Sequence, residues 1–514
     1  MADGKQSRPK ARTVRGFRDR AQGELAAERA MLDTIRRTYE SYGFDALETP
    51  FVEYTDALGK FLPDVDRPNA GVFSFRDDDE QWVSLRYDLT APLARYYAEN
   101  QQHLPRPFRR YQIGTVFRND KPGPGRFREF IQCDADTVGT ASPSADAEMV
   151  MMFADTLEAL GLSRGDYAIK TSSRKILDGL LESIGVDPAA ADSKRGVVLR
   201  AVDKLDRLGP NGVYQLLTTG RKDDSGDFTE GANLLPAQAD NVLRFLGYAS
   251  KVAEGNRVAY VEVTEGRPGT EDIEGVLDWF AKRVELGPSG QQGLSELRAI
   301  ASLVSSAGYG DGRVHLDPTI VRGLEYYTGT VFEAQLTFPV KNEKGQEVVF
   351  GSVGGGGRYD DLVARFTGQK TPAVGFSIGV SRLLTALQMR NGGSVAAVAP
   401  LVVVTVFDKN DASPAFAMVG ELRRAGVRAE AYVGTGKLGD QFKYADKRGA
   451  ALAIIQGPDE AAQGKVKIKD LALGAELAKS VESRAEWIGN HQAEVTVDRT
   501  ALVAEVQKLL KRGH

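Results

Sequence analysis

The chain is poor in the side chains that build most metal sites and most nucleophilic sites. Its 514 residues include one cysteine, Cys133, and four histidines that are scattered along the chain. A single cysteine excludes a disulfide within the chain, argues against a structural zinc site and fits a reducing compartment. The scattered histidines give a Ser-His-Asp or Cys-His site little to build on. We therefore expect that the protein supplies no metal ligands. We also expect that its chemistry does not depend on a cysteine or histidine nucleophile site.

Long apolar runs and an excess of positive charge are missing as well. No stretch of about 18 apolar residues occurs, so the sequence predicts no membrane span. The net charge is -4, so any contact with nucleic acid would depend on local basic patches. Residues 1–12 are polar and basic without the apolar core of a signal peptide, which indicates a disordered tail, with a mitochondrial presequence as the alternative. We expect a cytoplasmic protein.

A strand, loop and strand over residues 110–139 carry the most informative pattern. The loop 119–125 holds two prolines and two glycines and predicts a hairpin connection. Side chains alternate across a strand, so the second strand has two different faces, and its odd-numbered face is mostly apolar. The even face favours a floor for a small, charged, planar ligand, or an exposed face with cross-strand ion pairs. Its residues are Arg126, Arg128, Phe130, Gln132, Asp134 and Asp136.

Three further segments have patterns typical of binding sites. Arg86, Asp88 and Thr90 lie where a predicted strand gives way to a helix, and polar groups at strand ends commonly point into a site. Four consecutive glycines at 354–357 allow a backbone to approach a neighbour closely, unless they form a flexible loop. Arg382 falls in the first turn of a predicted helix, where a cation opposes the helix dipole. A bound anion would explain that position.

Periodicity divides the chain into several parts. Strand and helix patterns mix over 13–172, helical patterns dominate 173–312, and the sheet pattern returns over 313–392. After a linker at 393–399, strands and helices alternate over 400–514, which predicts a small α/β domain. We therefore expect an α+β domain that is interrupted by a largely helical insertion and followed by a separate α/β domain.

Four segments resemble the histidyl-tRNA synthetases, a family of class II aminoacyl-tRNA synthetases: FRNDKPGPGRFREFIQCDADTVG, LDPTIVRGLEYYTGTVFE, GGGGRYDDL and AVGFSIGVSRLL. Supporting matches are RGFRD, SYGFDALETPFVE as motif 1, SLRYDLTAPLARY, and KLGDQFKYADKRGA of the anticodon-binding domain. RGLEYYTG is the family-specific element, since motifs 2 and 3 are shared by all class II synthetases. The resemblance covers most of 14–484 and is weak over 173–312.

The resemblance implies a class II catalytic domain, an antiparallel sheet flanked by helices, in a homodimer formed through motif 1. It implies that histidine is activated with ATP, in the presence of Mg²⁺, to histidyl-adenylate and pyrophosphate. Histidine then passes to the 3′ end of tRNA(His). Two alternatives stay open: a catalytically inactive, synthetase-like regulatory subunit of histidine biosynthesis, and a glycyl or prolyl synthetase. The motif 2 loop KPGPG lacks the polar pair of many bacterial members, so the reading of the tRNA acceptor end stays open too.

The resemblance also implies how ATP is held. Arg118 and Arg322 are the expected catalytic cations at the α-phosphate, where negative charge develops. Arg126 and Arg382 would hold the β- and γ-phosphates of a bent ATP. The adenine ring would lie between Phe130 and Arg382, an arrangement that suits a guanidinium. The implied ATP-binding residues are Arg118, Asp120, Arg126, Phe130 and Arg382.

The implied histidine pocket lies further along the same strand. Asp88, Thr90 and Gln132 would bind the α-amino and carboxylate groups. Asp136 and Tyr327 would hydrogen-bond the two imidazole nitrogens. The glycine run and Tyr326 would close the pocket. Asp88 and Asp136 stand where glutamate is frequent in the family, so water could bridge these contacts. The implied histidine-binding residues are Asp88, Thr90, Gln132, Asp136, Arg322, Tyr326 and Tyr327.

Overall fold

The computed structural model describes residues 10–61, 71–122, 127–187, 193–222, 226–253, 257–263, 268–269, 272–317, 327–341, 345–390, 399–408, 410–474 and 493–512. The chain divides into two compact units, Met1–Val395 and Ala396–His514, which are described separately. Three predicted site residues lie outside the described ranges: Arg126, Arg322 and Tyr326. Most of the predicted tail and nearly all of the predicted linker lie outside them as well.

The larger unit is organised around a sheet of eight strands in the order β1-β5-β6-β15-β14-β13-β7-β12. The strands from β5 to β7 in this order pair antiparallel, and β1 and β12 add parallel pairs at the two edges. The predicted α+β class with an antiparallel sheet is confirmed. The bounds are β1 Asp45–Ala46, β5 Phe108–Phe117, β6 Glu129–Val138, β7 Tyr167–Ser173, β12 Val314–Leu316, β13 Thr330–Lys341, β14 Glu347–Arg358 and β15 Ala373–Gly379.

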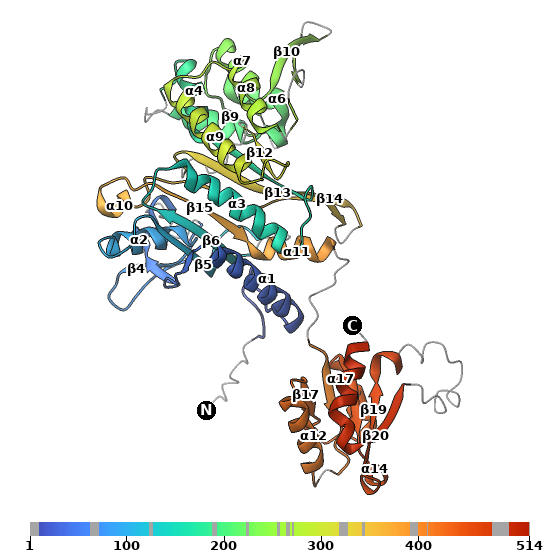
Figure 1. Cartoon of the computed structure of the whole chain (residues 1–514). Coiled ribbons are helices and arrows are strands. Elements are labelled where there is room, and N and C mark those ends of the chain that lie inside the picture. Colours follow the sequence, from blue (N-terminus) through green and yellow to red (C-terminus); the bar gives the residue numbers. More distant parts are fainter. Residues whose placement is uncertain are drawn as a thin grey trace, which may run out of the picture. The chain divides into compact units, whose positions relative to one another are not determined.

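Three helices cover one face of this sheet: α1 (Gln22–Ser41), α3 (Pro143–Ala159) and α11 (Val380–Arg390) (Figure 1). Tyr39, Phe153 and Phe376 are buried in the layer between helices and sheet, where the last two rings stack with their centroids 4.5 Å apart. Cys133 and Ala135 of β6 face this layer and are fully buried. The predicted apolar face of β6 is therefore confirmed, and the even-numbered face is left for the opposite side of the sheet.

The larger unit also contains a small sheet of three strands, in the spatial order β2-β4-β3. The extended segment that was predicted around Pro50 becomes two edge strands, β1 and β2, one in each sheet, which fits the inability of proline to donate to a ladder. Strand β4 then leads into helix α2. The bounds are β2 Val52–Tyr54, η1 Thr55–Phe61, β3 Ser74–Arg76, β4 Trp82–Leu85, α2 Thr90–Asn100 and α10 Ala364–Thr367.

Between β7 and β12 the described chain is largely helical, and α9 packs against α4 and α3. Two hairpins, β8 with β9 and β10 with β11, were not predicted; the strands of the first have only three residues each, and those of the second have six. The helices are α4 Arg174–Ser183, α5 Ser193–Val202, α6 Leu205–Leu217, α7 Pro236–Phe245, α8 Ile273–Ala281 and α9 Pro288–Ser306. The hairpin strands are β8 Gly220–Lys222, β9 Phe228–Glu230, β10 Tyr248–Ala253 and β11 Arg257–Glu262.

The smaller unit is an α/β domain with a five-stranded sheet in the order β17-β16-β18-β19-β20. Strand β20 was not predicted, because its last residues were assigned to a helix over 497–512. The β-branched residues of EVTVD favour the strand, and the helix begins after it. The strands are β16 Leu401–Val404, β17 Ala429–Ala431, β18 Ala450–Ile455, β19 Lys465–Asp470 and β20 Glu494–Asp498. The helices are α12 Ser413–Arg424, α13 Leu438–Lys447, α14 Pro458–Ala462 and α17 Leu502–Arg512.

No helix in the described ranges is both long enough and apolar enough to cross a membrane.

Candidate active site

The even-numbered face of β6 forms the floor of a cavity of about 1250 Å³, counted to its open mouth. Its walls come from the turn between β4 and α2 and from β13, β14 and β15. Segments that are far apart in the sequence thus meet over one strand. Six of the predicted site residues line this cavity: Asp88, Thr90, Arg118, Phe130, Gln132 and Tyr327.

Arg118 is held between two aromatic rings at the Phe130 end of the cavity. Its guanidinium carbon lies 4.4 Å from the ring centroid of Tyr87 and 5.2 Å from that of Phe130. Its Nε donates to the Tyr87 carbonyl over 3.3 Å. A stacked guanidinium keeps its edge free to donate to an anion, so this geometry suits a carboxylate or a phosphate. Tyr87 helps to position Arg118 through its ring and its carbonyl, and the sequence pattern did not indicate this residue.

Asp88 holds the turn that leads into α2. Its Oδ1 accepts hydrogen bonds from the backbone N–H groups of Thr90, over 3.2 Å, and Ala91, over 2.9 Å. Burial raises the pKa of Asp88, and the Ala91 hydrogen bond opposes that shift. The short side chain suits this capping geometry, which gives a local reason for aspartate at a position where glutamate is frequent.

Gln132 and Asp134 follow on the floor and have unused acceptors. Gln132 Nε2 donates to Ser377 Oγ over 2.5 Å, whereas Gln132 Oε1 and Asp134 Oδ1 are buried without a hydrogen-bond partner among the described residues. Burial, assisted by the negative charge of Asp136, raises the pKa of Asp134 to about 7, while Arg110 and Ser377 act in the opposite direction. Burial also raises the pKa of Tyr327, with the charge of Asp134 as the next cause.

Asp136 does not line the cavity. It is 2% exposed, its Oδ2 lies 2.8 Å from Nη2 of the fully buried Arg110, and its Oδ1 accepts a hydrogen bond from the hydroxyl of Tyr359. A Cβ atom at Gly375 on the neighbouring strand would overlap Oδ1, which explains the glycine there. The contact between Asp136 and a ligand ring stays a prediction, and Oδ2 has no hydrogen-bond partner among the described residues besides its ion pair with Arg110.

Two other predicted ATP-binding residues lie away from the cavity lining. The exposed Arg382 donates from Nη2 to the Phe350 carbonyl over 2.7 Å, and its guanidinium carbon lies 5.7 Å from the Phe350 ring centroid. Asp120 is exposed, and its carbonyl accepts a hydrogen bond of 2.9 Å from Arg128. Their roles with ATP stay predictions.

The glycine run belongs to strand β14 and is not a flexible loop. Gly354, Gly355 and Gly356 line the cavity. A Cβ atom at Gly356 would overlap the Gly375 carbonyl and the Phe332 ring, so close packing of strands explains the missing side chain. The predicted close approach is therefore to neighbouring strands.

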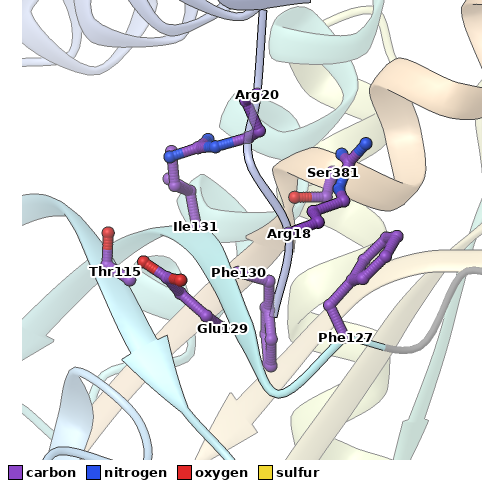
Figure 2. A pocket seen from close by; sticks show the side chains of 8 residues that line it. All are labelled: Arg18, Arg20, Thr115, Phe127, Glu129, Phe130, Ile131 and Ser381. Atoms are coloured by element: carbon purple, nitrogen blue, oxygen red, sulfur yellow. The ribbon is translucent and has the colours of Figure 1, made fainter. Parts of the chain in front are cut away.

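A second, smaller hollow lies at the start of β6, next to the chain segment that precedes α1. Figure 2 shows Arg18 and Arg20 of that segment, with the side chain of Arg18 on the side of Phe127 and that of Arg20 on the side of Ile131. The guanidinium carbon of Arg18 lies 4.4 Å from the ring centroid of Phe127, and Arg18 also pairs with Glu24. Phe130 lines this hollow and the larger cavity. Only the RGFRD match in the sequence pointed toward this segment.

Other residues differ from their sequence-based reading. Arg86 was predicted to point into a site, yet it is fully buried and donates to the carbonyls of Thr115 and Thr49, each over 2.7 Å. Glu333 and Ser377 line the cavity, and no sequence pattern indicated either of them. Among the residues that the structure describes, no group of three or more His, Cys, Asp or Glu side chains could hold a metal ion.

The raised pKa of Asp134 leads to a pH-dependent stability. The folded protein binds this proton more tightly than the unfolded chain, so the stabilisation is full below the unfolded pKa of 3.8 and is lost as the pH rises through about 7. We expect Asp134→Asn to stabilise the ligand-free protein at pH 8 and to lose this advantage near pH 4, as measured by denaturant unfolding. A stability difference that does not change with pH would contradict the assignment.

Comparison with known proteins agrees with this geometry. The family model described as histidyl-tRNA synthetase matches residues 16–220 and 244–383, and the model described as anticodon binding domain matches 401–509. A histidine–tRNA ligase from Rhodopseudomonas palustris (strain TIE-1) is 54% identical over 98% of this chain and 97% of its own length. One from Brucella abortus (strain S19) is 53% identical over 99% and 98%.

A solved histidyl-tRNA synthetase from Nostoc sp. PCC 7120 has a TM-score of 0.69 and 29% identity, and the match covers 99% of this chain and 100% of that one. The fold and the cavity therefore define an aminoacyl-tRNA synthetase. Within that class, the chain belongs to the histidyl-tRNA synthetase family.

Proposed function

We propose that this protein is a histidine–tRNA ligase. It activates histidine with ATP to histidyl-adenylate and pyrophosphate, and then transfers histidine to the 3′ end of tRNA(His). The observation that carries the proposal is one cavity with a stacked cation, Arg118, at one end of its floor and two unpartnered acceptors, on Gln132 and Asp134, further along. That order suits an amino acid whose carboxylate is activated and whose remaining groups donate hydrogen bonds. The relatives at 53–54% identity are histidine–tRNA ligases, which favours this reading over a regulatory subunit.

In the first step the histidine carboxylate attacks the α-phosphate of ATP and pyrophosphate leaves. Arg118, from the end of β5, stabilises the negative charge that develops on the phosphate oxygens. Arg322 acts beside it, in the segment RGLEYYTG. Because both side chains are cations, they lower the barrier without a proton transfer.

The remaining ATP contacts follow the implied pattern. Arg126 and Arg382 hold the β- and γ-phosphates, and Phe130 stacks on the adenine ring. Asp120 contacts the adenine. For this, the side chain of Arg382 must leave the Phe350 carbonyl, which an exposed arginine does at small cost. Mg²⁺ would bind together with the phosphates of ATP, whose oxygens are the kind of ligand that this ion prefers.

For the amino acid, Asp88, Thr90 and Gln132 bind the α-amino and carboxylate groups, and Tyr327 hydrogen-bonds the imidazole. Tyr326 and the glycine strand close the pocket. Asp136 is the implied second partner of the ring. Its Oδ1 accepts a hydrogen bond from the Tyr359 hydroxyl, and its Oδ2 forms an ion pair with Arg110.

The C-terminal unit binds the tRNA anticodon, a proposal supported by its match to the anticodon binding domain. Lysines of β19 alone do not make a basic surface, because Lys467 pairs with Glu460 over 2.7 Å and Lys469 pairs with Glu494 over 2.8 Å.

We further propose a cytoplasmic homodimer that forms through motif 1. Large apolar side chains on and next to the small sheet support this face: Phe51 is 50% exposed, Tyr54 59% and Trp82 43%. A second subunit would remove this surface from water.

The test is ATP–pyrophosphate exchange with the purified full-length chain and each of the twenty amino acids. We expect exchange with histidine alone, because the unpartnered acceptors in the cavity need a side chain with N–H donors. Exchange with glycine or proline would move the chain to those synthetases. No exchange with any amino acid would contradict the ligase proposal and favour a regulatory subunit.

A further inference from the structure

The chain segment before α1 contacts both sides of the hairpin that joins β5 to β6. We call residues 14–20 the strap. The Gly16 carbonyl accepts a hydrogen bond from the backbone N–H of Arg128 over 2.9 Å. A Cβ atom at Gly16 would lie 2.8 Å from Cγ and Cδ of Arg128 and 3.0 Å from Cγ of Pro122, so the strap packs against one residue on each side of the hairpin loop. Because Gly16 also has a φ of +87°, both its conformation and its packing favour glycine.

Ion pairs with helix α1 hold the strap in place. Arg20 donates from Nη1 to the buried Glu28 over 2.6 Å, and Arg18 pairs with Glu24 one turn earlier in the same helix. The guanidinium carbon of Arg18 also lies 4.4 Å from the ring centroid of Phe127, at the start of β6 (Figure 2). The strap therefore connects the first turns of α1 to the start of β6 through charge and ring contacts.

The start of β6 has less support from the sheet than the rest of the strand. Strand β15 pairs with β6 only from Gln132 to Val138. Among the described residues, the segment 128–131 therefore has a strand neighbour on one side alone, which is β5. Phe130 belongs to this segment and lines both the cavity and the hollow beside the strap. From Gln132 onward β6 is paired on both sides, so that part of the floor is fixed without the strap.

We propose that the strap positions the ATP end of the site, with Gly16 and Arg18 as its positioning residues. By holding the start of β6, the strap fixes the ring of Phe130 against Arg118, where the adenine and the α-phosphate of ATP bind in the proposed reaction. Displacing such groups by about 1 Å can cost on the order of 100-fold in rate. The amino acid binds along the part of β6 that is paired on both sides and so does not depend on the strap. The proposal rests on the proposed function and adds to it an element outside the cavity.

The test is Gly16→Val in the full-length chain, with pyrophosphate exchange measured over a range of ATP and of histidine concentrations. A β-branched side chain at this φ is strained, and at Gly16 it also overlaps Arg128 and Pro122. We expect KM for ATP to rise at least about tenfold and KM for histidine to stay within about twofold. Gly161→Val is the matched control, because Gly161 has the same φ of +87° and a Cβ atom there would meet nothing within 4 Å. It should lower thermal stability and change neither KM.

Variants of Arg18 test the strap independently and give the same reading if Gly16→Val does not fold. Arg18→Ala removes the cation from Phe127 and Glu24 and should raise KM for ATP alone, whereas Arg18→Lys keeps a cation there and should restore most of the affinity. An unchanged KM for ATP in both Gly16→Val and Arg18→Ala, or equal rises for ATP and histidine, would overturn the proposal. If the wild type shows no exchange with any amino acid, the ligase proposal fails separately, and equilibrium binding of ATP still tests the strap. Equal dissociation constants for ATP in Gly16→Val and Gly161→Val would then overturn it.

Discussion

Replacing Arg118 with alanine should reduce histidine-dependent pyrophosphate exchange by about 100- to 1000-fold, the usual cost of removing a donor that stabilises transition-state charge. The guanidinium stacks between Tyr87 and Phe130, so it is held in place before substrates bind. A preorganised cation contributes more to the transition state than to the bound ground state. We therefore expect the loss mainly in kcat, measured at saturating histidine and ATP.

The control for Arg118 is an arginine of the same strand pair that lies outside the cavity. Arg109 of β5 pairs with Glu148 over 2.5 Å and lies over the ring of Phe44. Arg109→Ala should change thermal stability slightly and leave kcat within about twofold, since surface pairs contribute little. Equal losses in both variants would mean that Arg118 acts through the fold and not through the phosphate.

Replacing Arg358 with methionine should lower the free energy of unfolding by about 3–5 kcal/mol, because it leaves a buried carboxylate without its partner. Arg358 binds both carboxylate oxygens of Asp146 and donates from Nη1 to the Thr140 carbonyl over 2.8 Å. Asp146 is 1% exposed, so water cannot replace the lost cation. Denaturant unfolding monitored by circular dichroism measures the change.

Two comparisons test the cause of that loss. The double variant Arg358→Met with Asp146→Leu should recover much of the stability, because no charge stays buried. Lys370→Met removes a cation from an exposed pair with Asp361, 2.9 Å apart, and should cost no more than about 1 kcal/mol. A double variant as unstable as Arg358→Met would show that the arginine matters for packing and not for charge.

The alternation along β6 made the floor of the site predictable from the sequence. One strand presents Cys133 and Ala135 to the helices and Gln132 and Asp134 to the cavity, as its period of two requires. The turn into α2 was predictable for a similar reason, because a strand end followed by a helix start puts Asp88 at the site. The local periodicity of the sequence was therefore enough to predict both the floor of the site and the position of Asp88.

Tertiary partners decided the features that the sequence did not predict. Asp136 and Asp134 are equivalent in the pattern, but Tyr359, 223 residues away, reaches only Asp136. Arg86 and Asp88 both lie at the end of the same strand in the sequence pattern. In the structure, Arg86 is turned away from the site by its hydrogen bonds to the carbonyls of Thr49 and Thr115. Such differences depend on partner residues that are distant in the sequence, which the periodicity of a single strand or helix does not reveal.

The two-sided use of β6 has a consequence for how the protein reaches its native state. A shift of one residue in the pairing of β6 with β15 would exchange the faces, and Asp134 and Asp136 would point into the apolar layer beneath α1 and α3. The same shift would present Cys133 and Ala135 to the ligand. Carboxylates in an apolar layer are so unfavourable that this alternative register is strongly disfavoured during folding. The side chains that recognise the substrate therefore also help to ensure that the sheet assembles in only one alignment.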